Sequence, residues 1–308
     1  MKKPLPQPRR YFPVSKNPFA FSAGLNALQA NEKIIQMDKQ YPVYIKNKIQ
    51  NREKSFDQYV QKSELSASLE KVVIQYLVKQ LSHDWPEYFE VDYQNDVIQL
   101  TNKLSRKNIL FSAENMQLSS NHNEKYRDGL DALLMQMQED MSIVELHEGS
   151  DNIRYLHLCS PNFWSAKDKI GTSFVGAHTK VPDMEKMKQN HLAINQMLAS
   201  SGPFERFTWG LTTNNNLNQH PLNKTESRDF NQASDIYMRV ERQATIPLPN
   251  NNAYIFFIRT YFLNTNDLNS EEITRLIYSL NTMSPDIASY KGMNTQRETI
   301  ISRLKNII

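Results

Sequence analysis

The segment Ile236–Ile246 has a side-chain pattern that could do chemistry if the segment is a β-strand. Successive side chains of a strand point to opposite faces. Tyr237, Arg239, Glu241 and Gln243 would therefore share one face, and the apolar residues at 236, 238 and 240 would share the other. On a solvated sheet such a row would be a surface ion pair of little energetic value. In an enclosed site the same row suits a small charged ligand, and we predict a binding site here.

The residue types suggest a role for each group. A small charged ligand that leaves water needs a partner of opposite charge, which Glu241 would supply to a cation. Arg239 would hold Glu241 ionised or act as a charged hydrogen-bond donor to the ligand. Trp209 and Tyr237 would wall a small cation with their aromatic faces, although core packing explains Trp209 equally well. The sequence therefore predicts a catalytic set of Glu241, Arg239, Tyr237 and Trp209.

The elements that would position this set follow a recognisable order. Two strands are expected first, then short helices, a longer helix and three more strands; their ranges are Ile143–His147, Ile153–Cys159, Asp183–Ser200, Phe204–Thr212, Ile236–Ile246 and Ala253–Leu263. This is the order of a PAS domain, a five-stranded antiparallel sheet with helices covering one face. In such domains a ligand sits between the last helix and the final three strands. The match concerns topology, and a fold does not by itself define a function.

The remaining chain predicts additions to this core. The first 20 residues hold five prolines and indicate an extended arm. Apolar residues at helical spacing predict helices at Glu64–Leu81, Gly129–Glu145, Ser270–Met283 and Asn294–Ile307, and Tyr88–Leu100 is expected to be a hairpin or a loop. Asn269 and Glu272 have the spacing of a capping box. We expect an α+β fold with a helical N-terminal region (1–140), a PAS-like core (141–265) and C-terminal helices (266–308).

Composition narrows the class of protein. The 308 residues are 39% hydrophobic and 22% charged, which is typical of a globular chain. The 36 basic and 33 acidic residues balance too evenly for a nucleic-acid footprint. The single cysteine, Cys159, allows no intramolecular disulfide and fits a reducing compartment. Because no apolar run approaches ~18 residues and the N-terminus lacks a signal-peptide pattern, we expect a cytoplasmic protein without membrane contact.

Several short motifs resemble one protein family in order along the chain. They are Gly24-Leu25 with Asp38 and Tyr41; Gln138-Glu139-Asp140; Cys159-x-Pro161 with Trp164 and Lys169-Ile170-Gly171; His178 with Val181-Pro182; Arg206-x-x-Trp209; Arg239-Val240-Glu241-Arg242-Gln243; Phe257-Ile258-Arg259; and Tyr290-Lys291-Gly292. The chain resembles the haem-dependent oxidative N-demethylases, specifically their haem-binding α subunit, from Gly24 to about Leu304. It departs from the family pattern at Ala244-Thr245 and at His178-Thr179-Lys180.

This resemblance implies a haem b held in a PAS fold, with O2 activated at the iron. One methyl group of dimethylamine, or of a similar small secondary amine, would be oxidised to give methylamine and formaldehyde. Electrons would come from NADPH through reductase partner subunits that carry FMN and a 2Fe–2S cluster, so a hetero-oligomer is expected. The chain itself has neither a Gly-rich dinucleotide fingerprint nor a cysteine set for a cluster.

The resemblance also directs attention to a haem ligand. His178 lies within a shared motif and is our first choice as the axial ligand to the metal. His191 is a rival, because PAS haem sensors supply their ligand from the same helix. His157 is third, on a strand face expected to hold Ile153 and Tyr155. Each could instead be a packed, hydrogen-bonded histidine. Cys159 could supply a thiolate, although a lone buried thiol is usually inert.

Basic residues are candidate partners for the haem propionates. Lys169, Lys180 and Arg206 fit this role, or that of solvated surface charges. Alternation turns Arg242 away from Glu241, toward a structural contact or a propionate. Two other functions stay open: a haem-binding PAS sensor without turnover, and an interaction scaffold that has lost its cofactor.

Overall fold

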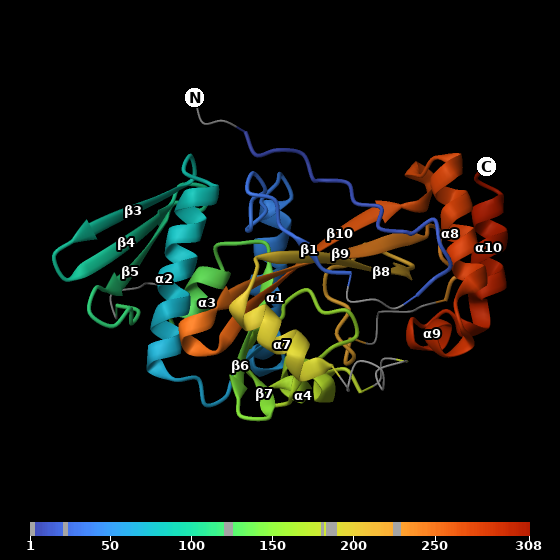
Figure 1. Cartoon of the computed structure of the whole chain (residues 1–308). Coiled ribbons are helices and arrows are strands. Elements are labelled where there is room, and N and C mark those ends of the chain that lie inside the picture. Colours follow the sequence, from blue (N-terminus) through green and yellow to red (C-terminus); the bar gives the residue numbers. More distant parts are fainter. Residues whose placement is uncertain (1–3, 21–23, 120–125, 180–181, 183–189, 224–228) are drawn as a thin grey trace.

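The computed structural model describes the chain except for residues 1–3, 21–23, 120–125, 180–181, 183–189 and 224–228 (Figure 1). The described residues form a seven-stranded sheet in the order β1-β8-β9-β10-β6-β7-β2, in which every pairing is antiparallel. The strands are β1 (Asn26–Ala27), β8 (Phe204–Thr212), β9 (Tyr237–Leu248), β10 (Ala253–Asn264), β6 (Asp140–His147), β7 (Ser150–His157) and β2 (Val60–Lys62). The α+β class is confirmed, while the sheet has two more strands than predicted.

One face of the sheet, here called the core face, carries Met141, Ile255, Met238 and Val240. It packs against helices α1 (Tyr41–Tyr59), α2 (Ala67–Asp84) and α3 (Gly129–Leu134) at one end and against α8 (Ser270–Thr282), α9 (Pro285–Tyr290) and α10 (Arg297–Lys305) at the other (Figure 1). Two hydrophobic clusters thus lie on the same side of the sheet.

The opposite face, here called the α7 face, carries Glu241, Gln243 and Ile258. It is covered by α7 (His191–Ser200), α4 (Ala166–Lys169) and α5 (Phe174–Ala177), whose buried residues form a third, smaller cluster with Val144 and Tyr254. The described part of the predicted Asp183–Ser200 helix is α7; residues 183–189 lie outside the described residues.

A second sheet stands at one end of the molecule beside α2 (Figure 1). It contains β3 (Phe89–Gln94), β4 (Val97–Asn102) and β5 (Lys107–Ser112) in sequence order. The hairpin expected at Tyr88–Leu100 is therefore present, extended by a third strand.

The N-terminal arm crosses the molecule toward the C-terminal helices, as the prolines predicted (Figure 1). Arg10 donates two hydrogen bonds to Glu272 of α8, at 2.6 and 2.5 Å. The backbone N–H of Phe19 donates to Thr282 Oγ1 at 2.9 Å. The arm thus closes over α8, whose predicted Asn269–Glu272 capping box is confirmed.

One helix prediction was wrong, and one helix was missed. The helix expected over Gly129–Glu145 ends at Leu134, and β6 begins at Asp140. Its apolar spacing continues into the strand because both elements are buried on every side. Helix α1 was not predicted, because its buried positions include Lys48 and Asn51 in place of an apolar stripe.

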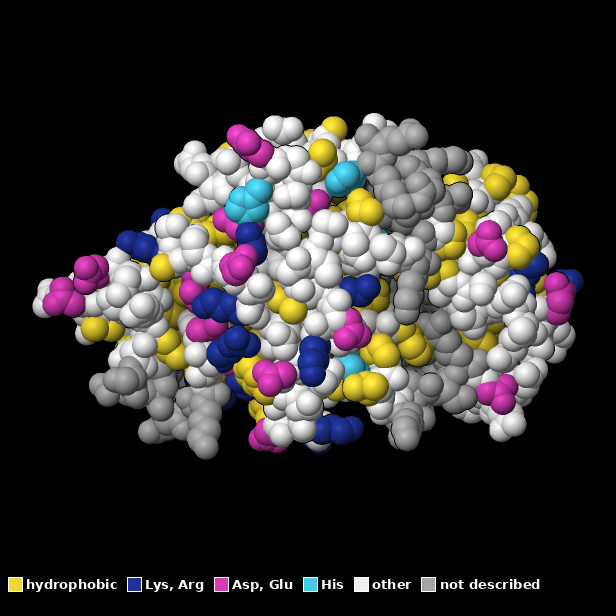
Figure 2. Space-filling model, turned by 90° about the horizontal axis from the view of Figure 1, so that it is seen from below, with side chains coloured by type: hydrophobic (Ala, Val, Ile, Leu, Met, Phe, Trp, Pro, Cys, Tyr) yellow, Lys and Arg dark blue, Asp and Glu magenta, His cyan; other side chains and the backbone are white. Residues whose placement is uncertain are grey.

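In the described part of the chain, no helix is both long and apolar enough to cross a bilayer. Figure 2 shows basic and acidic side chains interspersed over the face in view, without a large region of one sign. This distribution agrees with the near-even charge balance of the sequence.

Candidate functional site

Four polar side chains meet on the α7 face and are called here the polar row. Arg239 Nε lies 3.5 Å from Glu241 Oε1. Gln243 Nε2 donates to Glu241 Oε2 at 3.2 Å, and Arg206 Nε donates to Gln243 Oε1 at 2.7 Å. Alternation along β9 brings the first three together, as predicted. Arg206 joins them because it lies opposite Gln243 on β8.

The polar row is withdrawn from water to different degrees. The Arg239 side chain is 1% exposed and that of Glu241 is 14% exposed. Burial lowers the pKa of both Arg239 and Arg206, and the nearby Glu241 carboxylate opposes that change in each case. Glu241 is thus shared between two guanidinium groups, and it keeps a solvent-accessible edge.

Arg239 is fixed from several directions. Its Nη2 donates to Ser160 O at 2.6 Å and to Thr260 Oγ1 at 3.2 Å, and its Nη1 donates to Leu217 O at 3.1 Å. The guanidinium also lies 5.5 Å from the centre of the Phe262 ring. Such a group cannot swing toward a ligand, so it acts as a fixed charge beside Glu241.

An apolar strip runs beside the polar row. Phe256, Ile258 and Phe262 of β10 point to the α7 face and are only half-buried. On β8, Gly210 lies opposite Arg239, and a Cβ added to it would meet no described atom within 4 Å. A glycine inside a strand often marks a close approach of another group. The α7 face therefore combines charge, apolar surface and free space.

His178 directly follows α5 at the edge of this region. Its Nδ1–H donates to Phe174 O at 2.7 Å, and its ring packs on Trp164 and Phe174, with ring centres 4.8 and 4.3 Å away. Burial lowers the pKa of His178 to about 4, an effect that the charges of Arg206 and Lys169 increase. The imidazole is therefore neutral at pH 7. Its Nε2 has no hydrogen bond within the described residues.

The remaining candidates on this side differ in how they are placed. Lys169 ends α4 with its Nζ 5.1 Å from the Trp164 ring centre, close enough to His178 to affect its pKa. Tyr237 begins β9 on the face of Arg239. His191 is the first residue of α7 and half-buried, and Lys180 lies outside the described residues.

Two candidates lie on the core face, away from Glu241. Trp209 is opposite Val240 in the register and packs with Phe19 and the C-terminal helices. The sequence grouped Trp209 with Glu241. The face that Trp209 occupies depends on the register of β8 against β9, which the sequence of one strand does not give. Arg242 faces the core side as predicted, where its Nε donates to Glu205 at 2.8 Å and its Nη atoms donate to backbone carbonyls of residues 33 and 34.

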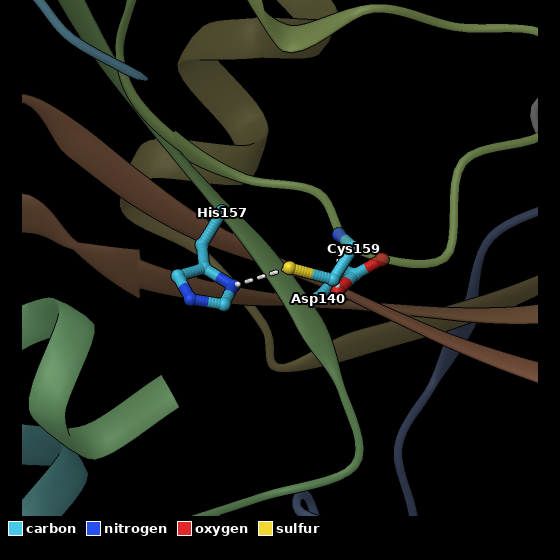
Figure 3. Close-up of side chains that lie close together, drawn as sticks. All are labelled: Asp140, His157 and Cys159. Atoms are coloured by element: carbon cyan, nitrogen blue, oxygen red, sulfur yellow. Dashed lines mark hydrogen bonds between the residues drawn. The ribbon is translucent and has the colours of Figure 1, made fainter. Parts of the chain in front are cut away.

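His157 also lies on the core side and does not share a face with Ile153, contrary to prediction. A β-bulge between Ile143 and Val144 shifts the pairing, so Tyr155 and His157 point to one side and Ile153 to the other. His157 is fully buried beside Asp140 and Cys159 (Figure 3). No pattern in the strand sequence signalled the bulge.

A cavity of about 350 Å³ lies elsewhere, beneath the N-terminal arm. Its lining includes Arg9, Asp38, Trp85, Tyr88 and Tyr261, and none of the predicted site residues. We therefore place the candidate site on the α7 face, where charge, apolar surface and a neutral imidazole converge.

The structure defines an α+β protein with a buried charged row and a neutral histidine on one side of an antiparallel sheet. A family model matches residues 24–301 of this chain. The chain belongs to the family described as haem-dependent oxidative N-demethylase, alpha subunit-like. The family's name implies an oxidoreductase that depends on haem and forms part of a multi-subunit complex.

Proposed function

We propose that this chain is the haem-binding subunit of a monooxygenase that N-demethylates dimethylamine, or a similar small amine. The observation that carries the proposal is that Arg206 lies within electrostatic reach both of neutral His178 and of Glu241, the partner of Arg239. Membership of the family supports the reaction class. The central strand order β7-β6-β10-β9-β8 supports a PAS-like core.

The residues of the α7 face fit a haem b. A histidine that ligates a metal usually donates its other ring N–H to a carbonyl or carboxylate, as His178 does to Phe174 O. His178 Nε2 would bind the haem iron, Arg206 and Lys169 would pair with the propionates, and Phe256 and Ile258 would contact the apolar part of the haem. When bound, the haem supplies the chemistry by which O2 oxidises the N-methyl group, one oxygen atom entering the substrate and the other leaving as water.

The protein's own groups bind and orient the amine. Glu241 pairs with the protonated nitrogen, and its partly exposed edge is the side from which the amine would approach. Arg239, held by backbone carbonyls, places a fixed positive charge beside Glu241 and supplies a fixed N–H donor. Tyr237 and Phe262 supply aromatic faces for the cation. Because Trp209 lies on the core face, it has no part in this arrangement.

Hydroxylation of the methyl group gives a carbinolamine. Its C–N bond then breaks, which releases formaldehyde and methylamine. The two electrons for each O2 would come from NADPH, through partner subunits that carry FMN and a 2Fe–2S cluster. The description of the family as an alpha subunit supports such partners.

The test is to reconstitute the purified chain with haem, titrate it with dimethylamine and assay formaldehyde under O2 with a chemical reductant. We expect a Soret band that shifts with the amine, and formaldehyde formation. A Soret band that responds to O2 or CO but not to the amine would favour the sensor, and no Soret band would overturn the haem assignment. His178→Ala should lose the axial ligand, whereas His191→Ala is the matched control and should retain it.

A further inference from the structure

Two shared motifs, at residues 138–140 and 159–161, have no role in the proposed site but meet in one buried cluster. Asp140, His157 and Cys159 are each at most 1% exposed, and one potential ligand atom from each lies within 4.8 Å of the others (Figure 3). A metal centre and a structural support are the two readings of this cluster. The neighbouring charges decide between them.

The cluster already contains a cation, the ammonium group of Lys48. The Lys48 side chain is 0% exposed, and Nζ donates to Leu134 O at 2.8 Å and Glu139 O at 2.5 Å. Nζ also lies 3.9 Å from Asp140 Oδ1. Burial lowers the pKa of Lys48 and raises that of Asp140, while their mutual attraction opposes both changes. Lys48 thus lies beside Asp140 and would compete with a metal ion for this carboxylate.

A second buried acid, Asp131, borders the cluster, and its negative charge is also balanced by a basic side chain. Asp131 Oδ2 lies 2.5 Å from Arg52 Nη2, and Asp131 Oδ1 lies 3.3 Å from His157 Nε2. Burial lowers the pKa of His157, so the ring is neutral. Two carboxylates face two basic side chains, and the cluster needs no added cation for charge balance.

Asp140 uses both oxygens to hold one turn of backbone. Oδ1 accepts the N–H of Cys159 at 2.9 Å, and Oδ2 accepts the N–H of Ser160 at 2.6 Å. The carbonyl of the same residue, Ser160, accepts the 2.6 Å hydrogen bond from Arg239. Lys48, Asp140, the 159–160 backbone and Arg239 therefore form one connected path from α1 to the polar row.

Arg239 in turn joins two loops. It donates to carbonyls of Ser160 and Leu217, and the two loops also share backbone hydrogen bonds: Gln219 N to Pro161 O at 3.0 Å and Phe163 N to Gln219 O at 2.9 Å. The position of the guanidinium therefore depends on a fixed 159–160 backbone.

We propose that Asp140, paired with Lys48, is the positioning residue for Arg239. It fixes the Ser160 carbonyl, which orients the guanidinium beside Glu241. The consequence for amine oxidation rests on the proposed function, whereas the positioning itself does not.

Hydrogen–deuterium exchange tests the order of this path without haem or substrate. In Asp140→Asn, one of the two acceptor oxygens becomes an NH2 group, so the amides of Cys159 and Ser160 should exchange roughly tenfold faster. Exchange in the 214–218 loop should rise as well. In Arg239→Gln only the 214–218 loop should change. Glu205→Gln, which removes the partner of Arg242 on the core face, is the matched control and should change neither segment.

Two results of the exchange experiment would overturn the proposal. One is faster exchange at 159–160 in Arg239→Gln, which would show that the 159–160 backbone depends on Arg239 and not the reverse. The other is normal exchange of the 214–218 loop in Asp140→Asn. If Asp140→Asn does not fold, the double variant Lys48→Met/Asp140→Asn removes both buried charges and should show the same two changes. A stoichiometric metal in the wild-type protein that is lost in His157→Ala would assign the cluster to a metal centre instead.

The functional readout separates positioning from bulk destabilisation. In haem-loaded Asp140→Asn we expect the haem content of the wild type, with the amine concentration for half-maximal Soret change raised roughly tenfold. An unchanged amine response despite faster exchange would show that Asp140 does not affect amine binding through Arg239. No amine response in the wild type would refute the proposed function and leave the exchange result valid.

Discussion

The two faces of the sheet both bury arginines, and they use them differently. On the core face, Arg259 is 0% exposed, pairs with Asp38 at 2.8 Å and stacks 3.8 Å from the centre of the Tyr44 ring. On the α7 face, Arg239 is equally buried, but its carboxylate partner Glu241 keeps a solvent-accessible edge beside free space. A buried arginine is therefore not in itself the sign of a site. The α7-face pair differs in the free space and the half-buried apolar strip that lie beside it.

The largest effect should come from breaking the closed pair on the core face. Arg259→Met leaves Asp38 buried without its cation, which should lower the free energy of unfolding by about 3–5 kcal/mol. Urea unfolding measures this loss. Lys16→Met, which breaks the exposed Lys16–Glu271 pair, is the control and should cost less than about 1 kcal/mol. Equal losses in the two variants would show that burial of the Arg259–Asp38 pair is not the source of the effect.

The two sides should also respond oppositely to pH. The pKa of His178 is lowered from 6.5 to about 4, so its contribution to stability is present above pH 6.5 and is lost as the pH falls toward 4. That contribution is at most about 3–4 kcal/mol, since one pKa unit corresponds to about 1.4 kcal/mol. The pKa of Glu139, on the other side, is raised by burial from 4.5 to about 7, so its contribution is present below pH 4.5 and is lost as the pH rises through 7.

Unfolding free energies at pH 5 and pH 7 would show this difference. Relative to the wild type, the gain in stability from pH 5 to pH 7 should be smaller in His178→Gln and larger in Glu139→Gln. If the gain in stability from pH 5 to pH 7 changes in the same direction in both variants, the pKa values of the two groups are not shifted in opposite directions.

The smallest effect concerns the free space on the α7 face. Gly210→Ala should raise stability by about 0.5–1 kcal/mol, because a strand glycine costs conformational entropy and the added methyl group meets no described atom within 4 Å. Gly149 also has no neighbour within 4 Å but has a φ of +73°, so Gly149→Ala should destabilise. Thermal unfolding compares the two. A loss of stability in Gly210→Ala would mean that the space is filled.

The sequence predicted the β9 residues of the polar row, because the alternation of side chains along a strand is a local property. Arg239, Glu241 and Gln243 needed only the assignment of β9 as a strand. The position of Trp209 needed the register between β8 and β9, and that of Ile153 needed the bulge in β6 and β7; neither is encoded within one strand. Register depends on long-range pairing.

Helix α1 illustrates a second limit. Its buried Lys48 and Asn51 gave it a polar pattern, because they bond to carbonyls of other segments rather than pack in an apolar core. Periodicity of hydrophobic residues cannot report a helix that is buried through polar contacts. The support for Arg239 was hidden for the same reason.

The central claim is that Glu241 on the α7 face binds the amine. The most direct measurement is dimethylamine titration and formaldehyde assay of haem-loaded Glu241→Gln, with Glu205→Gln as the core-face control. We predict that Glu241→Gln keeps its haem but loses both the Soret shift and turnover, while Glu205→Gln retains both. Turnover that survives in Glu241→Gln would contradict the account.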